Sequence, residues 1–376
     1  MPTIKAFFGS RAVLLLIILV IIEILIFALL VFGYFDKYFG KINLKSEKYL
    51  HPIGLQDPKN IEELNKVGAN WAAISIDWED MEPGLEKYDF TKLDQKISGL
   101  KRAPILLTVL AKHSRLTICG DEKTDSSCPP RKIEEYENFI KVLFDHLKDQ
   151  VQFVQIEKNL DKISWQGSED QYLELLKTAY NVKGSKIIAV ANIDLADSAN
   201  KEKLLASQNY DLIIVKSAEN SQDTQDKINT FNTSLKNKNI VQPIWAVLDF
   251  SLTQTEDSQL MQKETIKKTM ILLNTGVEKV FLYHATAPNL KNIFNMLAKT
   301  TSIKRIDFGN NIWAYQINSK TSKKPNYIMW ANGTAEINFS VLDPAYYDIT
   351  DFELKKIKIN SKKTTVNSNG LVMQAI

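Results

Sequence analysis

Strand-like and helix-like segments alternate through the middle of this chain, and this alternation constrains the fold more than any other feature. The strand-like segments are mostly apolar along their whole length, as parallel strands are when both faces of their sheet are buried. Eight such units predict an α/β protein with a (β/α)8 barrel. A doubly wound open sheet would have fewer units and usually a glycine-rich phosphate loop. The expected strands are residues 52–56, 71–77, 105–110, 152–157, 187–192, 212–216, 243–248 and 279–284.

Between these strands, apolar residues recur at the spacing of amphipathic helices. From about residue 302 the pattern changes to short segments in which polar and apolar residues alternate, which is typical of antiparallel strands. We therefore expect the barrel at residues 49–301 and a small β-sandwich-like domain at residues 302–376. The helices expected in the barrel include residues 61–67, 90–99, 133–148, 170–180, 223–235 and 263–274.

Residues 12–35 form an apolar run that is long enough to cross a bilayer, for which about 20 residues are needed. We interpret this run as an uncleaved transmembrane helix. The alternative is a signal peptide, whose apolar core would be ~7–15 residues and would precede a small-residue cleavage site. Glu23 interrupts the run. This residue is protonated, paired with a second membrane helix, or outweighed by its Leu and Ile neighbours.

Lysines and one arginine lie on both sides of the apolar run, so the positive-inside rule favours a cytoplasmic amino terminus only slightly. The large domain is then extracytoplasmic, and the protein crosses the membrane once. The expected arrangement is a cytoplasmic segment at residues 1–11, an anchor at 12–35 and a stalk at 36–48.

The overall composition is that of a globular protein, with 44% hydrophobic and 24% charged residues. The net charge of +3 is small and spread along the chain, which argues against a nucleic-acid partner. Cys119 and Cys128 are the only cysteines, and they lie in one polar segment. In an extracytoplasmic domain such a pair predicts a local disulfide. A metal site is less expected because no histidine or second cysteine pair lies nearby, and nothing in the sequence indicates a cofactor.

Several segments carry motifs of a known kind. Residues 68–83 with Tyr-Asp-Phe at 88–90 are similar to a second strand and its continuation, and residues 165–180 contain Trp-x-Gly, Tyr-x-x-Leu-Leu and Ala-Tyr. Residues 242–248 and 276–284 are similar to a seventh and an eighth strand. Together these segments resemble the clan A glycoside hydrolases, the (β/α)8 enzymes that include xylosidase/iduronidase-like and cellulase-like proteins. The resemblance runs through most of residues 50–300.

The resemblance also implies that the catalytic residues of that family are missing. The family's fourth strand ends in Asn-Glu-Pro, whose Glu is the general acid/base, and here Asn159 stands in its place. Leu248 stands at the position of the nucleophile, and Ala73 at that of an arginine that contacts it. A retaining glycosidase needs two carboxyl groups about 5–5.5 Å apart. Asparagine cannot donate a proton as an acid and leucine is no nucleophile, so the resemblance implies a pseudoenzyme.

Three nearby carboxyl groups are candidates to replace the missing ones. Glu157 has the same strand parity as Asn159, and we interpret it as a hydrogen-bonded carboxylate in the barrel interior. Asp249 follows Leu248 and is expected to point away from the barrel centre unless a bulge intervenes. Asp77 lies at the end of the second strand, where it serves either as a loop or cap residue or as a substitute acid.

Aromatic residues near the expected carboxyl ends of the strands are candidates for sugar stacking, because ligands of (β/α)8 barrels bind at that face. For Trp245, simple core packing is an equal alternative. The candidate substrate-binding residues are Trp78, Trp165, Trp245, Tyr283 and His284.

Three functions are compatible with these features. The first is a membrane-anchored glycoside hydrolase-like protein that has lost hydrolysis and binds or scaffolds a polysaccharide or oligosaccharide. The second is an active glycoside hydrolase that uses displaced carboxylates. The third is an assembly subunit of an envelope complex, with Glu23 pairing to a membrane protein. Hydrolysis separates the second from the other two, and glycan binding separates the first from the third.

Overall fold

The computed structural model describes residues 50–120, 126–248, 258–282, 290–309, 311–339, 344–359 and 363–376. They belong to one compact unit that spans Ser46–Ile376. The expected anchor at residues 12–35, with Glu23, lies outside the described part of the chain. Within the described part, no helix is both long and apolar enough to span a membrane.

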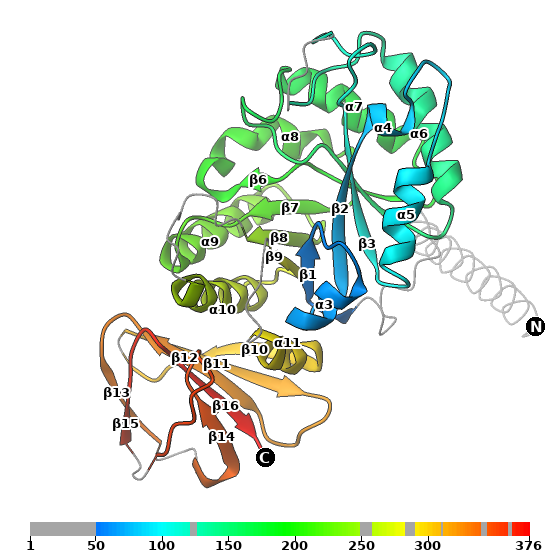
Figure 1. Cartoon of the computed structure of the whole chain (residues 1–376). Coiled ribbons are helices and arrows are strands. Elements are labelled where there is room, and N and C mark those ends of the chain that lie inside the picture. The colour runs from blue at the N-terminus through cyan, green and yellow to red at the C-terminus, as the bar shows by residue number, and fades with distance from the viewer. Residues whose placement is uncertain are drawn as a thin grey trace, which may run out of the picture. The chain divides into compact units, whose positions relative to one another are not determined.

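Nine strands of the described residues form one sheet, in the order β5-β4-β3-β2-β1-β9-β8-β7-β6. All of their pairings are parallel (Figure 1). The expected strand at 187–192 is shorter, β5, with the two-residue strand β6 just beyond it, and the other expected strands are present. The bounds are β1 (Ile53–Gln56), β2 (Trp71–Asp77), β3 (Ile105–Leu110), β4 (Phe153–Ile156), β5 (Ile187–Ala189), β6 (Ile193–Asp194), β7 (Ile213–Lys216), β8 (Ile244–Leu248) and β9 (Lys279–Leu282).

The sheet curls until its two ends meet. A parallel bridge joins Ala189, at the end of β5, to Leu212, just before β7. The amide of Val190 donates to the Leu212 carbonyl at 3.1 Å, and the amide of Leu212 donates to the Ile188 carbonyl at 3.2 Å. Helices follow the strands in turn, so the arrangement is that of a (β/α)8 barrel.

Three helices of the barrel begin at side chains that cap them. Ser168 and Gln171 form a reciprocal capping box at the start of α7, and Asn60 and Asn220 cap α3 and α9 with their side-chain oxygens. The bounds are α3 (Ile61–Val67), α4 (Trp78–Met81), α5 (Thr91–Gly99), α6 (Ile133–Leu147), α7 (Glu169–Asn181), η1 (Leu195–Lys201), α8 (Glu202–Ser207), α9 (Ser221–Asn237), α10 (Ser258–Asn274) and α11 (Leu290–Ala298).

An aromatic layer fills the barrel interior near the amino ends of the strands. The rings of Trp71, Phe153 and Trp245 lie 4.9–5.2 Å from one another by centroid, although β2, β4 and β8 are not neighbours in the sheet. Such contacts are possible only across the inside of a closed barrel. The Phe281 ring joins the layer 5.8 Å from that of Trp245, above Gly54 of β1.

A second sheet of five antiparallel strands follows the barrel, in the order β10-β11-β12-β16-β14, and β13 pairs separately with β15. One face of the five-stranded sheet, with Trp313 and Trp330, joins the core of the barrel unit, and the other face forms a second core with the β13–β15 pair. The bounds are β10 (Thr300–Ile306), β11 (Ile312–Ser319), β12 (Asn326–Ala331), β13 (Ala335–Asn338), η2 (Pro344–Tyr346), β14 (Tyr347–Thr350), β15 (Lys363–Val366) and β16 (Leu371–Ala375).

Gly54 tests the packing of the aromatic layer. A Cβ atom at this position would lie 2.4 Å from the Phe281 ring, so we expect Gly54→Ala to lower the free energy of unfolding by ~1–3 kcal/mol through overpacking. Adding Phe281→Leu should recover part of the loss. In Gly84→Ala the new Cβ atom would have no contact closer than 3.7 Å, so this control should unfold within ~0.5 kcal/mol of wild type. Urea unfolding measures the stability of all three variants. Equal stabilities would contradict the close packing of Phe281 against Gly54.

Candidate functional site at the barrel mouth

A chain of polar side chains runs across the interior at the carboxyl ends of the strands, which we call the barrel mouth. The Thr108 hydroxyl of β3 donates to Gln155 Oε1 of β4 at 2.8 Å. Gln155 Nε2 donates to Asn192 Oδ1 at 2.9 Å and to the Val190 carbonyl at 3.0 Å. Asn192 Nδ2 in turn donates to Asn159 Oδ1 at 3.0 Å. Thr108 and Gln155 are buried, so their polar groups need these partners.

Asn159 is therefore held as part of a structural network. Its backbone pairs in a parallel bridge with Asn192, and the Asn192 amide donates to the Lys158 carbonyl at 2.8 Å. An amide side chain that accepts a hydrogen bond in this way offers no titratable proton. The residue at the expected acid/base position thus joins the end of β4 to the segment between β5 and β6.

Glu157, the first residue after β4, does not line the mouth as strand alternation would suggest. Its φ of 60° lies in the left-handed region, which interrupts the alternation of side chains along the strand. The side chain is only 1% exposed, and its Oε1 accepts the Ala111 amide at 2.5 Å. Its electrostatic neighbours include Tyr136 and Tyr172 of the outer helices α6 and α7. The carboxyl group therefore lies beneath the loop that follows β3.

Burial raises the pKa of Glu157 to about 7, and hydrogen bonds from the Ala111 amide and the Ser127 side chain oppose that rise. Charged neighbours also act on it, since Lys112 lowers this pKa and Asp77 raises it. A carboxyl group of this kind carries its proton over much of the neutral range. Such a pKa suits a general acid, but the carboxyl group accepts its hydrogen bonds from within the protein rather than at an open site.

The predicted disulfide between Cys119 and Cys128 is confirmed, with Cα atoms 6.1 Å apart. The amide of Cys128 donates to the Ala111 carbonyl at 3.0 Å, and the adjacent Ser127 amide donates to the Ser164 carbonyl at 2.8 Å. Ser127 is 1% exposed and hydrogen-bonds to Glu157. The disulfide thus closes the loop that covers this carboxyl group.

Leu248 occupies a different place from the one we expected. It ends β8 fully buried in the outer layer with Ala246, whereas Trp245 of the alternate parity points into the interior. We expected Asp249 to point away from the barrel centre because we assumed that Leu248 faces the mouth. This assumption is wrong, since Leu248 faces the helices. Asp249 itself lies outside the described residues. Ala73 of β2 is buried and has the interior parity of Trp71.

Asp77 ends β2 and is half-buried at the mouth. Burial raises its pKa, and the nearby Lys112 opposes this by stabilising the charged form. Asp77 precedes α4 but makes no capping hydrogen bond with its side chain. Glu157 is buried and Asp249 lies outside the described residues, so Asp77 is the candidate substitute whose carboxyl group is seen partly open to solvent.

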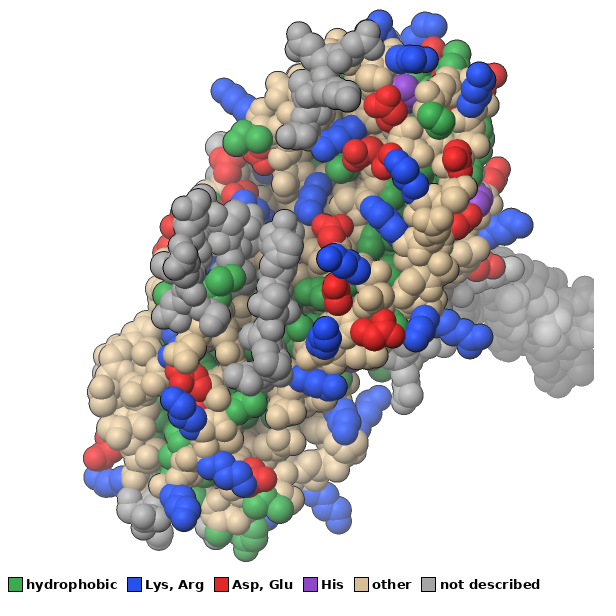
Figure 2. Space-filling model, in the orientation of Figure 1, with side chains coloured by type: hydrophobic (Ala, Val, Ile, Leu, Met, Phe, Trp, Pro, Cys, Tyr) green, Lys and Arg blue, Asp and Glu red, His purple; other side chains and the backbone are tan. Residues whose placement is uncertain are grey.

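Ion pairs link the rim of the mouth, and sequence reasoning missed the residues that form them. Lys158 after β4 lies 3.5 Å from Asp57 after β1, so this pair passes over β2 and β3. Lys216 of β7 lies 3.9 Å from Asp194 of β6. Basic and acidic side chains are also interspersed over the face shown in Figure 2. A usable signal existed in the sequence, since Asp57, Lys158 and Lys216 end apolar strands.

The expected stacking tryptophans are inside the protein, which corrects our assignment of them to substrate binding. Trp78 is 0% exposed, stacks on Phe139 and donates its indole N–H to Glu82 at 2.7 Å. Trp165 is 4% exposed beside Tyr172, and Trp245 belongs to the aromatic layer near the amino ends of the strands. A buried ring has no free face for a sugar. Tyr283 and His284 lie outside the described residues.

Within the described ranges, no cluster of three or more histidine, cysteine, aspartate or glutamate residues could hold a metal ion.

Several solved structures superpose on this chain over most of its length. A family 39 glycoside hydrolase from Bacteroides cellulosilyticus WH2 superposes with a TM-score of 0.67 and 10% identity over 88% of this chain and 82% of that one. SrfJ from Salmonella typhimurium superposes with a TM-score of 0.59 and 9% identity, over 86% of this chain and 89% of that one. N2152 from Neocallimastix frontalis superposes with a TM-score of 0.55 and 11% identity, over 86% of this chain and 95% of that one. Comparison with models of protein families and with curated proteins finds no match.

These likenesses establish the fold, since identities this low carry no residue roles. The protein has a (β/α)8 barrel similar in fold to the family 39 glycoside hydrolase, followed by an antiparallel sheet. The resemblance inferred from the sequence motifs is confirmed at this level.

The raised pKa of Glu157 has a measurable effect on stability. The folded state holds this proton up to about pH 7, whereas the ordinary pKa of a glutamate is 4.5, so wild-type stability falls as pH rises between these values. In Glu157→Gln the amide oxygen still accepts from Ala111 but nothing titrates. We expect the wild type to lose ~3 kcal/mol relative to this variant between pH 4.5 and 8.

Urea unfolding at several pH values measures the difference. Asp77→Asn is the matched control, because Asp77 is partly exposed and its substitution should change the pH dependence less. A difference between wild type and Glu157→Gln that stays constant from pH 4.5 to 8 would contradict the buried assignment.

Proposed function

We propose that this protein is a membrane-anchored, extracytoplasmic barrel of the glycoside hydrolase type that does not hydrolyse glycosides and that binds or scaffolds glycans. The observation that carries the proposal is that the side chains just after β4 are hydrogen-bonded within the protein or buried. Asn159 accepts a hydrogen bond from Asn192, and Glu157 is buried under the disulfide-closed loop. No carboxyl group among the described residues that end β4 is open to the mouth.

The chemistry of retaining hydrolysis explains why this matters. One carboxylate attacks the anomeric carbon and a second, about 5–5.5 Å away, protonates the leaving oxygen and later activates water. At this mouth the second residue after β4 is Lys158, whose ammonium group pairs with Asp57. An ammonium group cannot replace the carboxylate that attacks the anomeric carbon.

The same groups are suited to binding. Sugar hydroxyls both donate and accept hydrogen bonds, and the mouth offers the amides of Asn159 and Asn192 together with the Lys158–Asp57 pair. These contacts replace the aromatic stacking that the buried tryptophans exclude. The solved glycoside hydrolases of this fold support an oligosaccharide or polysaccharide as the ligand class.

The second candidate is an active hydrolase with displaced carboxylates, and one observation favours it. Glu157 has the pKa of about 7 that a general acid would need, and Asp77 at the end of β2 has a raised pKa as well. For catalysis the loop over Glu157 would have to open. The hydrogen bonds from Ala111 and Ser127 and the neighbouring disulfide oppose such an opening.

The third candidate, an assembly subunit of an envelope complex, rests on Glu23 within the apolar run and on a membrane-protein partner for it. A protein that binds no glycan and hydrolyses none would leave this candidate standing.

We predict that the purified protein does not turn over nitrophenyl glycosides. Nitrophenolate leaves with little help from an acid, so a surviving nucleophile alone would still give measurable release. Assays over a panel of sugars, read by absorbance, should show no release above the buffer rate. Turnover that disappears in Glu157→Gln, Asp77→Asn or Asp249→Asn would instead establish the displaced-carboxylate mechanism.

A glycan array run on the same preparation tests binding. Binding should weaken in Asn159→Ala, because the amide network of the mouth is lost, and should persist in Asn237→Ala, which removes an exposed amide on α9. Equal binding by both variants would place the glycan elsewhere on the protein.

The anchor predicts a fractionation result. The full chain should stay with membranes in carbonate at high pH and enter detergent, since residues 12–35 are long enough to span a bilayer. A chain that begins at residue 46 is the matched control and should be soluble. Recovery of the native protein in a form that begins near residues 36–45 would instead indicate a cleaved signal.

A further inference from the structure

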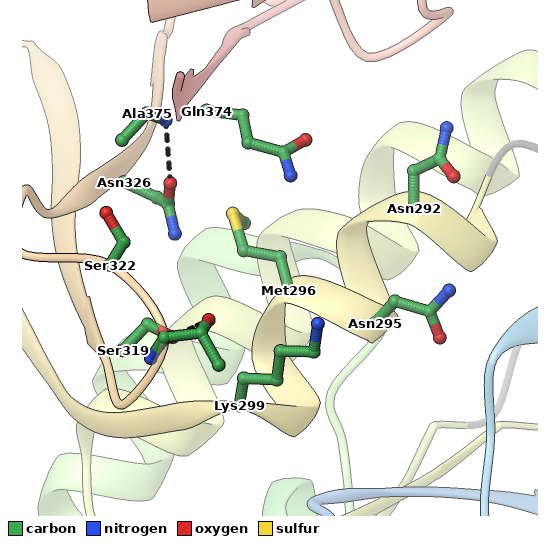
Figure 3. Close-up of a pocket in the computed structure, with 10 residues that line it drawn as sticks. Asn292, Asn295, Met296, Lys299, Ser319, Ser322, Asn326, Gln374 and Ala375 are labelled. Carbon is green, nitrogen blue, oxygen red and sulfur yellow. Dashed lines mark hydrogen bonds between the residues drawn. The ribbon is translucent and has the colours of Figure 1, made fainter.

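A second polar pocket lies far along the chain from the barrel mouth, between α11 and the antiparallel sheet. Its volume is ≈ 330 Å³, which is at the lower end of pockets that hold small molecules. Figure 3 shows Asn292, Asn295 and Lys299 on the helix side and Ser319, Asn326 and Gln374 on the side of the strands. The pocket combines the last helix of the barrel with β11, β12 and β16.

The lining is unusual for a small-molecule pocket because it is mostly polar. Such pockets are ordinarily lined by apolar and aromatic side chains with a few polar groups. Here the apolar residues are Met296 and Ala375, and the others carry amides, hydroxyls or an ammonium group. Amide and hydroxyl groups offer both donors and acceptors, which matches a ligand that carries several hydroxyl groups.

One side chain of this lining is already oriented by the fold. Asn326 is 5% exposed, and its Oδ1 accepts the Ala375 amide at 2.9 Å. This bond fixes the amide plane and leaves Nδ2 as the donor, which faces the pocket in Figure 3. A preorganised donor of this kind binds an oxygen of a ligand at little entropic cost.

Lys299 gives the pocket its charge. It is the only charged residue of the lining, and no carboxylate lines the pocket. Among the ion pairs and side-chain hydrogen bonds of the described residues, none engages its ammonium group. The pocket therefore presents one positive charge to whatever enters it.

From these features we infer that this pocket binds a polyhydroxylated ring with one carboxylate, that is, a uronic acid or a sugar acid of similar size. The carboxylate pairs with Lys299, and the ring hydroxyls meet the amides of Asn326 and Gln374. The site is distinct from the barrel mouth, so it stands or falls independently of the proposed function.

The test uses glucuronate as the probe with the full-length protein in detergent, measured by calorimetry at low ionic strength. We expect saturable binding in the millimolar range, at least fivefold weaker binding of glucose, and at least fivefold weaker binding of acetate, which lacks the ring. Lys299→Met should weaken the binding of glucuronate at least fivefold. Lys320→Met, an exposed lysine that follows Ser319 but does not line the pocket, should leave it unchanged.

Asn237→Ala, which removes an exposed amide on α9 that does not line the pocket, should also leave glucuronate binding unchanged. The inference is overturned if glucuronate shows no saturable binding, if Lys299→Met binds it as tightly as wild type, or if acetate binds as tightly as glucuronate. Thermal unfolding of each variant establishes that it is folded, and Lys299→Gln replaces Lys299→Met if the latter is not.

Discussion

The hydrogen bond from the Ala111 amide to the Glu157 carboxyl group holds together the carboxyl ends of β3 and β4, where the candidate site lies. It joins the end of β3 to the end of β4, and Ser127 adds the disulfide-closed loop to the same carboxyl group. Glu157 reaches this position through a left-handed backbone, with φ of 60°. The result is a carboxyl group that is buried just after the end of β4.

The interior of the barrel is divided by chemistry along its axis. Near the amino ends of the strands it is filled by aromatic rings that meet across the barrel, with Gly54 making room for Phe281. Near the carboxyl ends it holds the amide chain from Thr108 to Asn159. The aromatic layer stabilises the closed sheet, and the amide chain keeps its own polar groups satisfied in a buried setting. The proposed binding face therefore lies on a packed core.

Much of the fold could be predicted from the sequence because buried parallel strands read as apolar runs, and the cysteine pair was legible from its spacing in a polar segment. The site was less accessible. Leu248 was placed at the mouth from a motif, yet the parity of a strand end depends on where the strand enters the barrel, which a motif does not contain. Trp78 and Trp165 lie near strand ends in sequence but beneath loops in space. The left-handed turn at Glu157 leaves no signal in a single sequence, since glutamate rarely adopts it.

The central claim is that this barrel lacks a working nucleophile and acid, and trapping the covalent intermediate tests it most directly. A retaining enzyme treated with 2-deoxy-2-fluoro aryl glycosides forms a long-lived glycosyl ester on its nucleophile, because the fluorine slows both steps and the activated leaving group restores the rate of the first step only. Intact-mass spectrometry after incubation with a panel of such glycosides should show this protein unmodified. A stoichiometric adduct that maps to a carboxylate of the barrel would contradict the account.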